Sequence, residues 1–162
     1  MRAELLSGDA GVRIRPYKLT DMLGVARVFQ QARREVSNWA SGSSAFKTSN
    51  PGIALVSEQG GGITGILVGR QVVDEAEIFA VAVLPEQRRR GIGSALLLKA
   101  LSEFRVRGVA RVFLEVRESN INAIAFYKKH GFSETGRRKA YYDDPEEDAV
   151  LMAKQLNPNE SR

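Results

Sequence analysis

Several residue types that carry enzyme chemistry are scarce in this chain. It has no cysteine and a single histidine, His130. Without cysteine it can form no disulfide, no thiolate metal site and no cysteine nucleophile. A single histidine also excludes a multi-histidine metal site, so no bound metal is expected. Any catalytic chemistry must therefore use carboxylates, tyrosines, other hydroxyls or backbone amides.

Long hydrophobic runs are also missing. The longest, IFAVAVL at residues 78–84, is far shorter than the roughly 20 residues that a helix needs to cross a bilayer. Residues 1–11 contain no apolar stretch typical of a signal peptide. We therefore expect a soluble cytoplasmic protein that is not secreted and has no membrane partner.

The size and charge of the chain limit its organisation and its partners. With 162 residues, of which 43% are hydrophobic, it can form one domain with a sizeable core. We place this domain at residues 12–156, between a flexible N-terminal segment (1–11) and a polar C-terminal tail (157–162). The net charge of +5 favours anionic partners, but it does not distinguish nucleic acid from a phosphorylated small molecule.

The apolar pattern predicts alternating strands and helices. Strands are expected near residues 12–15, 53–59, 63–73, 76–84, 112–116, 132–137 and 148–156. Helices are expected near residues 22–32, 93–107 and 120–130. The glycines at 60–62 are typical of a hairpin loop, and residues 141–148 of a longer loop. The predicted fold is a single α/β domain with a mixed, mostly antiparallel sheet flanked by helices.

A basic loop, RRRGIGS at residues 88–94, follows the strand at 76–84 and leads into the helix at 93–107. The apolar run of that strand predicts that it is buried on both faces. The N–H groups and the positive dipole end of that helix would attract phosphate. Gly91 and Gly93 leave the backbone accessible, and the arginines would supply charge. The alternative is a solvated loop in which the glycines only cap the helix. A dinucleotide fingerprint fits poorly, because Leu96 stands where a third glycine is required.

The loop and the motifs that follow it resemble the Gcn5-related N-acetyltransferases, which bind acetyl-coenzyme A. RRRGIG is similar to the Q/R-x-x-G-x-G/A loop that holds the cofactor's diphosphate in this family. FLEVRESNINAIAFYKKHGF (113–132) and RRKAYYDDPEEDAVLM (137–152) are similar to the RimI-type members, which acetylate the N-terminal alanine of a small-subunit ribosomal protein. The resemblance covers about residues 12–156 and implies direct acetyl transfer to an amine, without an acyl-enzyme.

The resemblance also implies where acetyl-coenzyme A binds. In this family the end of the strand matching 76–84 separates from its neighbour, so that its backbone pairs with the pantetheine arm and an amide can stabilise the oxyanion. Asn120 matches a cofactor contact of the family, although it could instead cap a helix. The residues expected to bind the cofactor are Val81, Ala82, Val83, Arg88, Arg89, Arg90, Gly91, Ile92, Gly93, Ser94 and Asn120.

Glu115 is the expected general base, a role that the resemblance implies for the glutamate of its LEVR motif. The strand pattern places Glu115 on the opposite face from the apolar residues, and burial in a cleft would raise its pKa. Alternatively, it is a surface carboxylate paired with Arg111 or Arg117. Glu77 is a rival base, which we rank second.

Tyr127 is the expected general acid, because the matching tyrosine has this role in the family and a phenol can protonate a thiolate. Alternatively, it is a residue of an amphipathic core. Tyr141 and Tyr142 match paired tyrosines beside the family's substrate groove, although they could equally be ordinary aromatic residues at a strand end. Trp39 lies in a segment that only partly resembles the substrate-binding loop, and His130 is interpreted as the end of a helix.

We therefore expect an acetyl-coenzyme A-dependent N-acetyltransferase that acts on a protein N-terminus, with a ribosomal protein as one candidate acceptor. One alternative is an acetyltransferase for a small-molecule amine or a lysine side chain. The other is a non-catalytic basic module that binds RNA. Few aromatic residues accompany the arginines, which argues against base stacking, so direct binding to nucleic acid is not expected.

Overall fold

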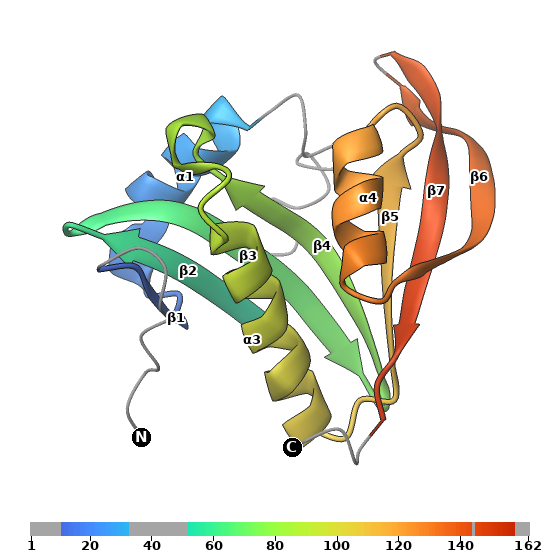
Figure 1. The fold of residues 1–162 in the computed structure, drawn as a ribbon, viewed down its shortest axis with the longest axis horizontal. Helices are drawn as coiled ribbons and strands as arrows, with labels where there is room; N and C mark the ends of the chain where they lie inside the picture. The colour runs from blue at the N-terminus through green and yellow to red at the C-terminus, as the bar shows by residue number, and fades with distance from the viewer. Residues whose placement is uncertain (1–10, 33–51, 144, 158–162) are drawn as a thin grey trace.

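The computed structural model describes residues 11–32, 52–143 and 145–157 (Figure 1). Trp39 and most of the predicted terminal segments, 1–11 and 157–162, lie outside the described residues. No helix in the described ranges is both long and apolar enough to span a membrane.

A seven-stranded sheet forms the centre of the structure, in the order β1-β2-β3-β4-β5-β7-β6 (Figure 1). All neighbouring strands are antiparallel except β4 and β5, which are parallel. The predicted mixed, mostly antiparallel sheet is therefore confirmed. The strands are β1 (Arg13–Pro16), β2 (Ile53–Gln59), β3 (Gly62–Val72), β4 (Glu75–Val83), β5 (Arg111–Arg117), β6 (Ser133–Asp143) and β7 (Glu146–Gln155).

Three α-helices in the described residues cover the two faces of this sheet. One face packs on α1 and the other on α3 and α4, so each face has its own apolar cluster (Figure 1). Leu96, Leu97 and Phe104 of α3 are fully buried, and each such side chain stabilises the fold by about 1.5–3 kcal/mol. The helices are α1 (Met22–Gln31), α3 (Ile92–Val106) and α4 (Ile121–Lys129), with the 3-10 turns η1 (Leu19–Asp21) and η2 (Pro85–Gln87).

β4 contributes to both apolar clusters. A bulge at Phe79 shifts its register, because Val68 pairs with Ala80 and Gly69 pairs with Ile78. Ile78 therefore belongs to the cluster beneath α3, whereas Ala80 belongs to the cluster beneath α1. The strand is covered on both faces, as its continuous apolar run predicts.

β4 and β5 pair over only part of their length. Their pairing stops at Glu77 and Phe113. Both strands continue, β4 to Val83 and β5 to Arg117, and Figure 1 shows them diverging. The separation that the resemblance implies is therefore confirmed. Within the described part of the chain, it leaves one edge of β4 without a strand partner.

The two predicted hairpin connections have different outcomes. Gly60 and Gly61 connect β2 to β3 with φ values of 57° and 78°, which a tight two-residue turn requires. The predicted loop at residues 141–148 is wrong, because β6 continues to Asp143 and β7 begins at Glu146. Charged residues do not interrupt pairing here, since a hairpin at the sheet edge can expose them to water.

Candidate active site

The loop at residues 88–94 leads into the N-terminus of α3. Gly91 is the N-cap residue, with a φ of 77° and no side chain to cap the helix. A Cβ atom built on Gly91 would meet no atom of the described chain within 4 Å, so the backbone is open to approach. The first N–H groups of a helix have no intrahelical acceptor, and its dipole is positive at this end. The geometry therefore suits a bound anion.

The arginines of this loop also hold the loop itself. Arg88 Nε donates to the carbonyl oxygen of Val83 at 3.2 Å, which ties the loop to the end of β4. Arg90 Nη1 donates to Gln87 Oε1 at 3.2 Å. Arg89 is exposed and has a positive φ of 63°. The three residues thus help to form the turn, in addition to the charge that the sequence predicts for a ligand.

The first turn of α3 packs on α4 and β4. A Cβ atom at Gly93 would lie 3.7 Å from the Phe126 ring and 3.9 Å from Val83 Cγ2. These are ordinary van der Waals distances, so the packing alone does not require glycine at position 93. The absence of a side chain there fits the predicted need for an accessible backbone.

His130 joins the end of α4 to the start of α3. Its Nε2 atom lies 2.9 Å from Ser94 Oγ, at a hydrogen-bonding distance. Its ring meets Phe126 edge to face, with centroids 4.8 Å apart. Burial, together with the charges of Lys129 and Lys154, lowers the pKa of His130. The residue therefore does more than end a helix, because it fixes α4 against the first turn of α3.

The register of β4 shows which of its main-chain groups face the separation from β5. Leu84 N–H donates to the Thr64 carbonyl at 2.9 Å, which makes Val83 part of a non-hydrogen-bonded pair with β3. Pair types alternate along an antiparallel ladder, so the N–H and C=O groups of Val81 and Val83 point toward β5, while those of Ala82 point toward β3. The main-chain groups of Val81 and the N–H of Val83 can therefore be offered to a ligand. The Val83 carbonyl already accepts from Arg88 Nε, and Ala82 uses its own groups within the sheet.

Glu115 lies on the face of β5 that is turned away from α3 and α4. Its neighbours Leu114 and Val116 belong to the apolar cluster beneath those helices. The Glu115 side chain is 15% exposed, and its Oε1 atom is 3.4 Å from Arg138 Nε. The carboxylate is thus held mostly out of water, beside a cation from β6.

The predicted alternative partners of Glu115 are engaged elsewhere. Arg117 Nη1 is 3.2 Å from Glu147 Oε2. The guanidinium carbon of Arg111 lies 4.6 Å from the centroid of the Phe113 ring. Spacing along β5 suggests these neighbours, but the β5-β7-β6 order of the sheet brings Arg138 to Glu115 instead. No signal in the sequence alone identifies Arg138.

The two adjacent tyrosines of β6 lie in different environments. Tyr141 is 38% exposed, and its hydroxyl donates a hydrogen bond to Glu115. That bond, and to a smaller extent burial, raises the pKa of Tyr141 to about 12. Tyr142 is 3% exposed, and the Arg117 guanidinium lies 4.4 Å from its ring centroid. Tyr141 is therefore placed to contact a ligand at Glu115, whereas Tyr142 is buried and packs against Arg117.

Tyr127 lies in the apolar cluster beneath α4, where it is largely buried. The rings of Phe126 and Phe132 meet it edge to face, with centroids 5.2 and 5.6 Å away. Burial raises the pKa of Tyr127, so its hydroxyl stays protonated at neutral pH. Because Leu114 is in the same cluster, Tyr127 and Glu115 lie on opposite faces of β5. The motif spacing did not predict this division.

Two further candidates have local structural roles. Asn120 is the N-cap of α4, and its Oδ1 atom accepts from Ala123 N–H at 3.2 Å. The helix-cap interpretation is therefore confirmed, and contact with the cofactor stays a prediction. Glu77 Oε2 is 3.2 Å from Arg70 Nη2, and Glu77 lies where β4 and β5 still pair. Both observations agree with ranking Glu77 second, after Glu115, as the candidate base.

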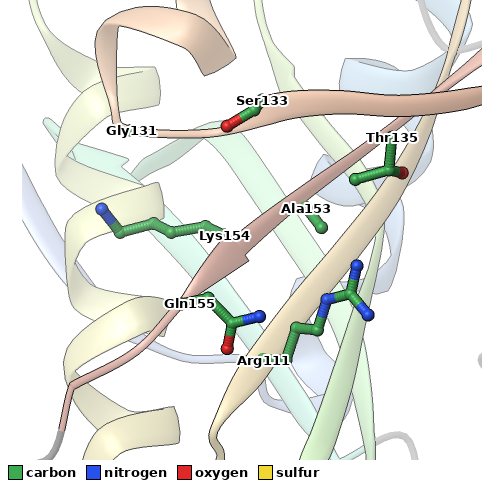
Figure 2. A pocket seen from close by; sticks show the side chains of 7 residues that line it. All are labelled: Arg111, Gly131, Ser133, Thr135, Ala153, Lys154 and Gln155. Atoms are coloured by element: carbon green, nitrogen blue, oxygen red, sulfur yellow. The ribbon is translucent and has the colours of Figure 1, made fainter.

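A polar pocket lies away from these residues, at the start of β5. Figure 2 shows Lys154 pointing away from Arg111 across β7. Within the described residues, no group of three or more His, Cys, Asp or Glu side chains could hold a metal. The pocket contains none of the predicted site residues, so we do not place the reaction there. Its lining residues are Arg111, Gly131, Ser133, Thr135, Ala153, Lys154 and Gln155.

Comparisons with known proteins agree with this architecture. Residues 21–132 match the sequence profile of the acetyltransferase (GNAT) family. The [ribosomal protein bS18]-alanine N-acetyltransferase of Escherichia coli (strain K12) is 44% identical over 97 residues, which make up 59% of this chain and 66% of that protein. An N-alpha-acetyltransferase of Sulfurisphaera tokodaii is 47% identical over 88 residues, 52% of this chain and 51% of that protein.

A solved structure covers more of the chain than these sequence matches do. The crystal structure of the ribosomal-protein-S18-alanine N-acetyltransferase from Escherichia coli is similar with a TM-score of 0.76 and 32% sequence identity. The match covers 91% of this chain and 97% of that one. The sequence matches span just under two thirds of the Escherichia coli relative and about half of the Sulfurisphaera relative.

Proposed function

The chain belongs to the acetyltransferase (GNAT) family, and from this premise we propose that it transfers an acetyl group from acetyl-coenzyme A to the N-terminal α-amino group of a protein. One observation carries the proposal: β4 and β5 separate between the open N-terminus of α3 and the Glu115 carboxylate. The relatives named above are alanine and N-alpha acetyltransferases, which favours a protein N-terminus as acceptor. By the same likeness, we propose a ribosomal protein as the acceptor and the cytoplasm as the location.

The groups on the α3 side of the sheet fit acetyl-coenzyme A. The main-chain N–H groups of residues 91–94 would hold its diphosphate, and the arginines of the loop would add positive charge. The main-chain groups of Val81 and the N–H of Val83 would pair with the amides of the pantetheine arm. When bound, the cofactor supplies the acetyl group as an activated thioester. The remaining chemistry is two proton transfers, which this chain must perform.

Glu115 would accept the proton that the acceptor amine has to lose. An α-amino group has a pKa of about 7.7–8.0, compared with about 10.4 for lysine, so a carboxylate can deprotonate it more easily. Glu115 is held mostly out of water by its neighbours, and the Tyr141 hydroxyl orients its carboxylate through a hydrogen bond. These features favour an N-terminal amine over a lysine side chain.

Tyr127 would donate a proton to the departing thiolate. Its hydroxyl is protonated at neutral pH, because burial raises its pKa above the usual value. A thiol has a reference pKa of about 8.5, below that of the phenol, so full proton transfer is uphill, and the Tyr127 hydroxyl would first stabilise the forming thiolate by donating a hydrogen bond to its sulfur. A main-chain N–H of Val81 or Val83 would stabilise the oxyanion of the tetrahedral intermediate.

The two faces of the sheet would have different tasks in this reaction. The diphosphate and pantetheine groups would contact the face that carries α3 and α4, where Tyr127 lies. The acceptor would approach from the opposite face, where Glu115 and Tyr141 lie. The separated strands let both reactants meet between the faces, which agrees with direct transfer and requires no nucleophilic side chain.

A thiol-release assay tests this function. The acceptors are a peptide with a free N-terminal alanine, the same peptide with a blocked N-terminus and an internal lysine, and a polyamine. We expect release with the free-alanine peptide to be at least about tenfold faster than with the other two, since a site that binds a specific amine rejects other acceptors by this amount or more. Faster release with the polyamine or the blocked peptide would overturn the choice of acceptor. Release with none of them, together with salt-sensitive RNA binding that needs no cofactor, would overturn the enzyme assignment.

A further inference from the structure

β6 contains a bulge of three residues next to Glu115. Arg138 pairs with Ala149 and Tyr142 pairs with Glu147, so the three residues 139–141 lie opposite one residue of β7, Asp148. Ala140 has a φ of 50°, in the left-handed region that non-glycine residues rarely adopt. Such strained positions persist where the surrounding structure holds them, and they cluster at functional sites.

Asp148 holds this bulge in place. Its Oδ1 atom accepts a hydrogen bond from Ala140 N–H at 2.9 Å. In a regular antiparallel pair, residues 139–141 would occupy three ladder positions and their side chains would alternate between the two faces. The bulge instead allows Arg138, which precedes it, and Tyr141, its last residue, to contact the same carboxylate, Glu115.

The side chains of Arg138 and Tyr141 form one cluster with Glu115. Arg138 Nε is 3.4 Å from Glu115 Oε1, and the Arg138 guanidinium lies 5.5 Å from the centroid of the Tyr141 ring. The exposures differ strongly, because Glu115 is 15% exposed and Arg138 is 58% exposed. The carboxylate is therefore fixed, while the guanidinium lies on the solvent side and is held by a weak, exposed ion pair.

We propose that Arg138 is a resident cation that occupies the position of the acceptor's ammonium group on Glu115, and that the acceptor binds by displacing it. This inference rests on the proposed function, because it takes Glu115 to be the base. At neutral pH an N-terminal amine reaches the site largely as an ammonium ion. Only a cation can replace another cation on the carboxylate without leaving the buried charge unpaired.

The displacement would also distinguish substrate from product. Acetylation converts the ammonium group into a neutral amide, which cannot pair with Glu115. Arg138 can then return to the carboxylate, and the product no longer forms an ion pair in the site. Arg138 would thus act as a specificity-determining residue that sets how strongly the charged acceptor is preferred.

Arg137 provides a matched control for this inference. It precedes Arg138 on β6, carries the same charge and is 49% exposed. Its ion pair is with Glu118, and its Nη1 donates to the Glu118 carboxylate. Arg137→Gln therefore removes the same charge from the neighbouring position without touching Glu115.

Isothermal titration calorimetry tests the inference with two probes: a peptide with a free N-terminal alanine and the same peptide with that alanine acetylated. We expect Arg138→Gln to bind the free peptide about two- to fivefold more tightly than the wild type, the size of an exposed ion pair. Its affinity for the acetylated peptide should not change, and Arg137→Gln should match the wild type for both peptides. The gain for Arg138→Gln should shrink at high salt.

The contrary results separate this inference from the proposed function. If the wild type binds the free peptide but the two variants bind it alike, or Arg138→Gln binds it more weakly, Arg138 is not a resident competitor. If Arg138→Gln increases the affinity for both peptides equally, the effect of the substitution is steric and the inference is also overturned. If the wild type binds neither peptide and releases no thiol, the proposed function fails and the inference fails with it.

Discussion

The two sides of the candidate active site are built in different ways. On the α3 side, the groups offered to a ligand are main-chain groups, supplied by the loop at 88–94 and by one edge of β4. On the opposite side, they are charged and phenolic side chains from β5 and β6, held together by a bulge. A main-chain site needs only a short run of consecutive residues, whereas a side-chain cluster depends on how distant strands are paired.

Glu115→Gln should have the largest effect, and only on the acceptor side. The amide keeps the shape of the side chain but cannot take a proton, so turnover should fall by about 10²–10⁴-fold. Affinity for acetyl-coenzyme A should stay the same, because Glu115 faces away from α3. Steady-state kinetics and calorimetry measure the two quantities. A similar loss in Glu118→Gln, a nearby exposed carboxylate, would show that the effect is one of net charge and not of this residue.

The same substitution should also lower the pKa of Tyr141 from about 12 toward the ordinary value of about 10. The Glu115 carboxylate accepts a hydrogen bond from the Tyr141 hydroxyl and repels the phenolate, so removing its charge makes ionisation of Tyr141 easier and moves it to lower pH. An ultraviolet absorbance titration measures this shift, and the Tyr141→Phe variant identifies the signal. An unchanged titration curve would mean that the Glu115–Tyr141 contact does not form in solution.

On the cofactor side, Gly93→Ala should weaken binding of acetyl-coenzyme A by about tenfold or more. The added methyl group would disturb at least one charge-assisted hydrogen bond at the helix N-terminus, which contributes about 1.5–3 kcal/mol. The fold can accept this methyl group at ordinary contact distances from Phe126, so the free energy of unfolding should not fall. Calorimetry and urea denaturation measure the two effects.

Gly91→Ala is the matched comparison for this prediction. The space around Gly91 is open, but its φ of 77° is unfavourable for a residue with a Cβ atom. The free energy of unfolding of this variant should therefore fall by about 1–2 kcal/mol. If Gly93→Ala lost stability and kept its cofactor affinity, the glycine would serve packing and not the ligand.

The cofactor side was largely predictable from the sequence, because its signals are local. Glycines at fixed positions before a helical pattern identify an open helix N-terminus. The separation of β4 and β5 followed from the resemblance to a family, and the structure confirms it. Which groups of β4 face that separation required the register with β3.

The acceptor side was less predictable, because its contacts join residues that are distant in the chain. The sequence placed Tyr141 and Tyr142 together, but the bulge in β6 turns one toward Glu115 and leaves the other buried. Arg138 approaches Glu115 only through the β5-β7-β6 strand order, which no motif encodes. Residues 141–148 were predicted to form a loop, because the turn-forming and charged residues there gave a stronger signal than the strand pattern did.

Amide hydrogen exchange, measured by NMR with and without coenzyme A, tests whether the edge of β4 and the N-terminus of α3 bind the cofactor. We expect slower exchange at Val81, Val83 and residues 91–94 when coenzyme A binds, with little change at Ala82, whose main-chain groups already pair with β3. Protection confined to the pocket beside Arg111, or no change along β4 and at the start of α3, would contradict this expectation.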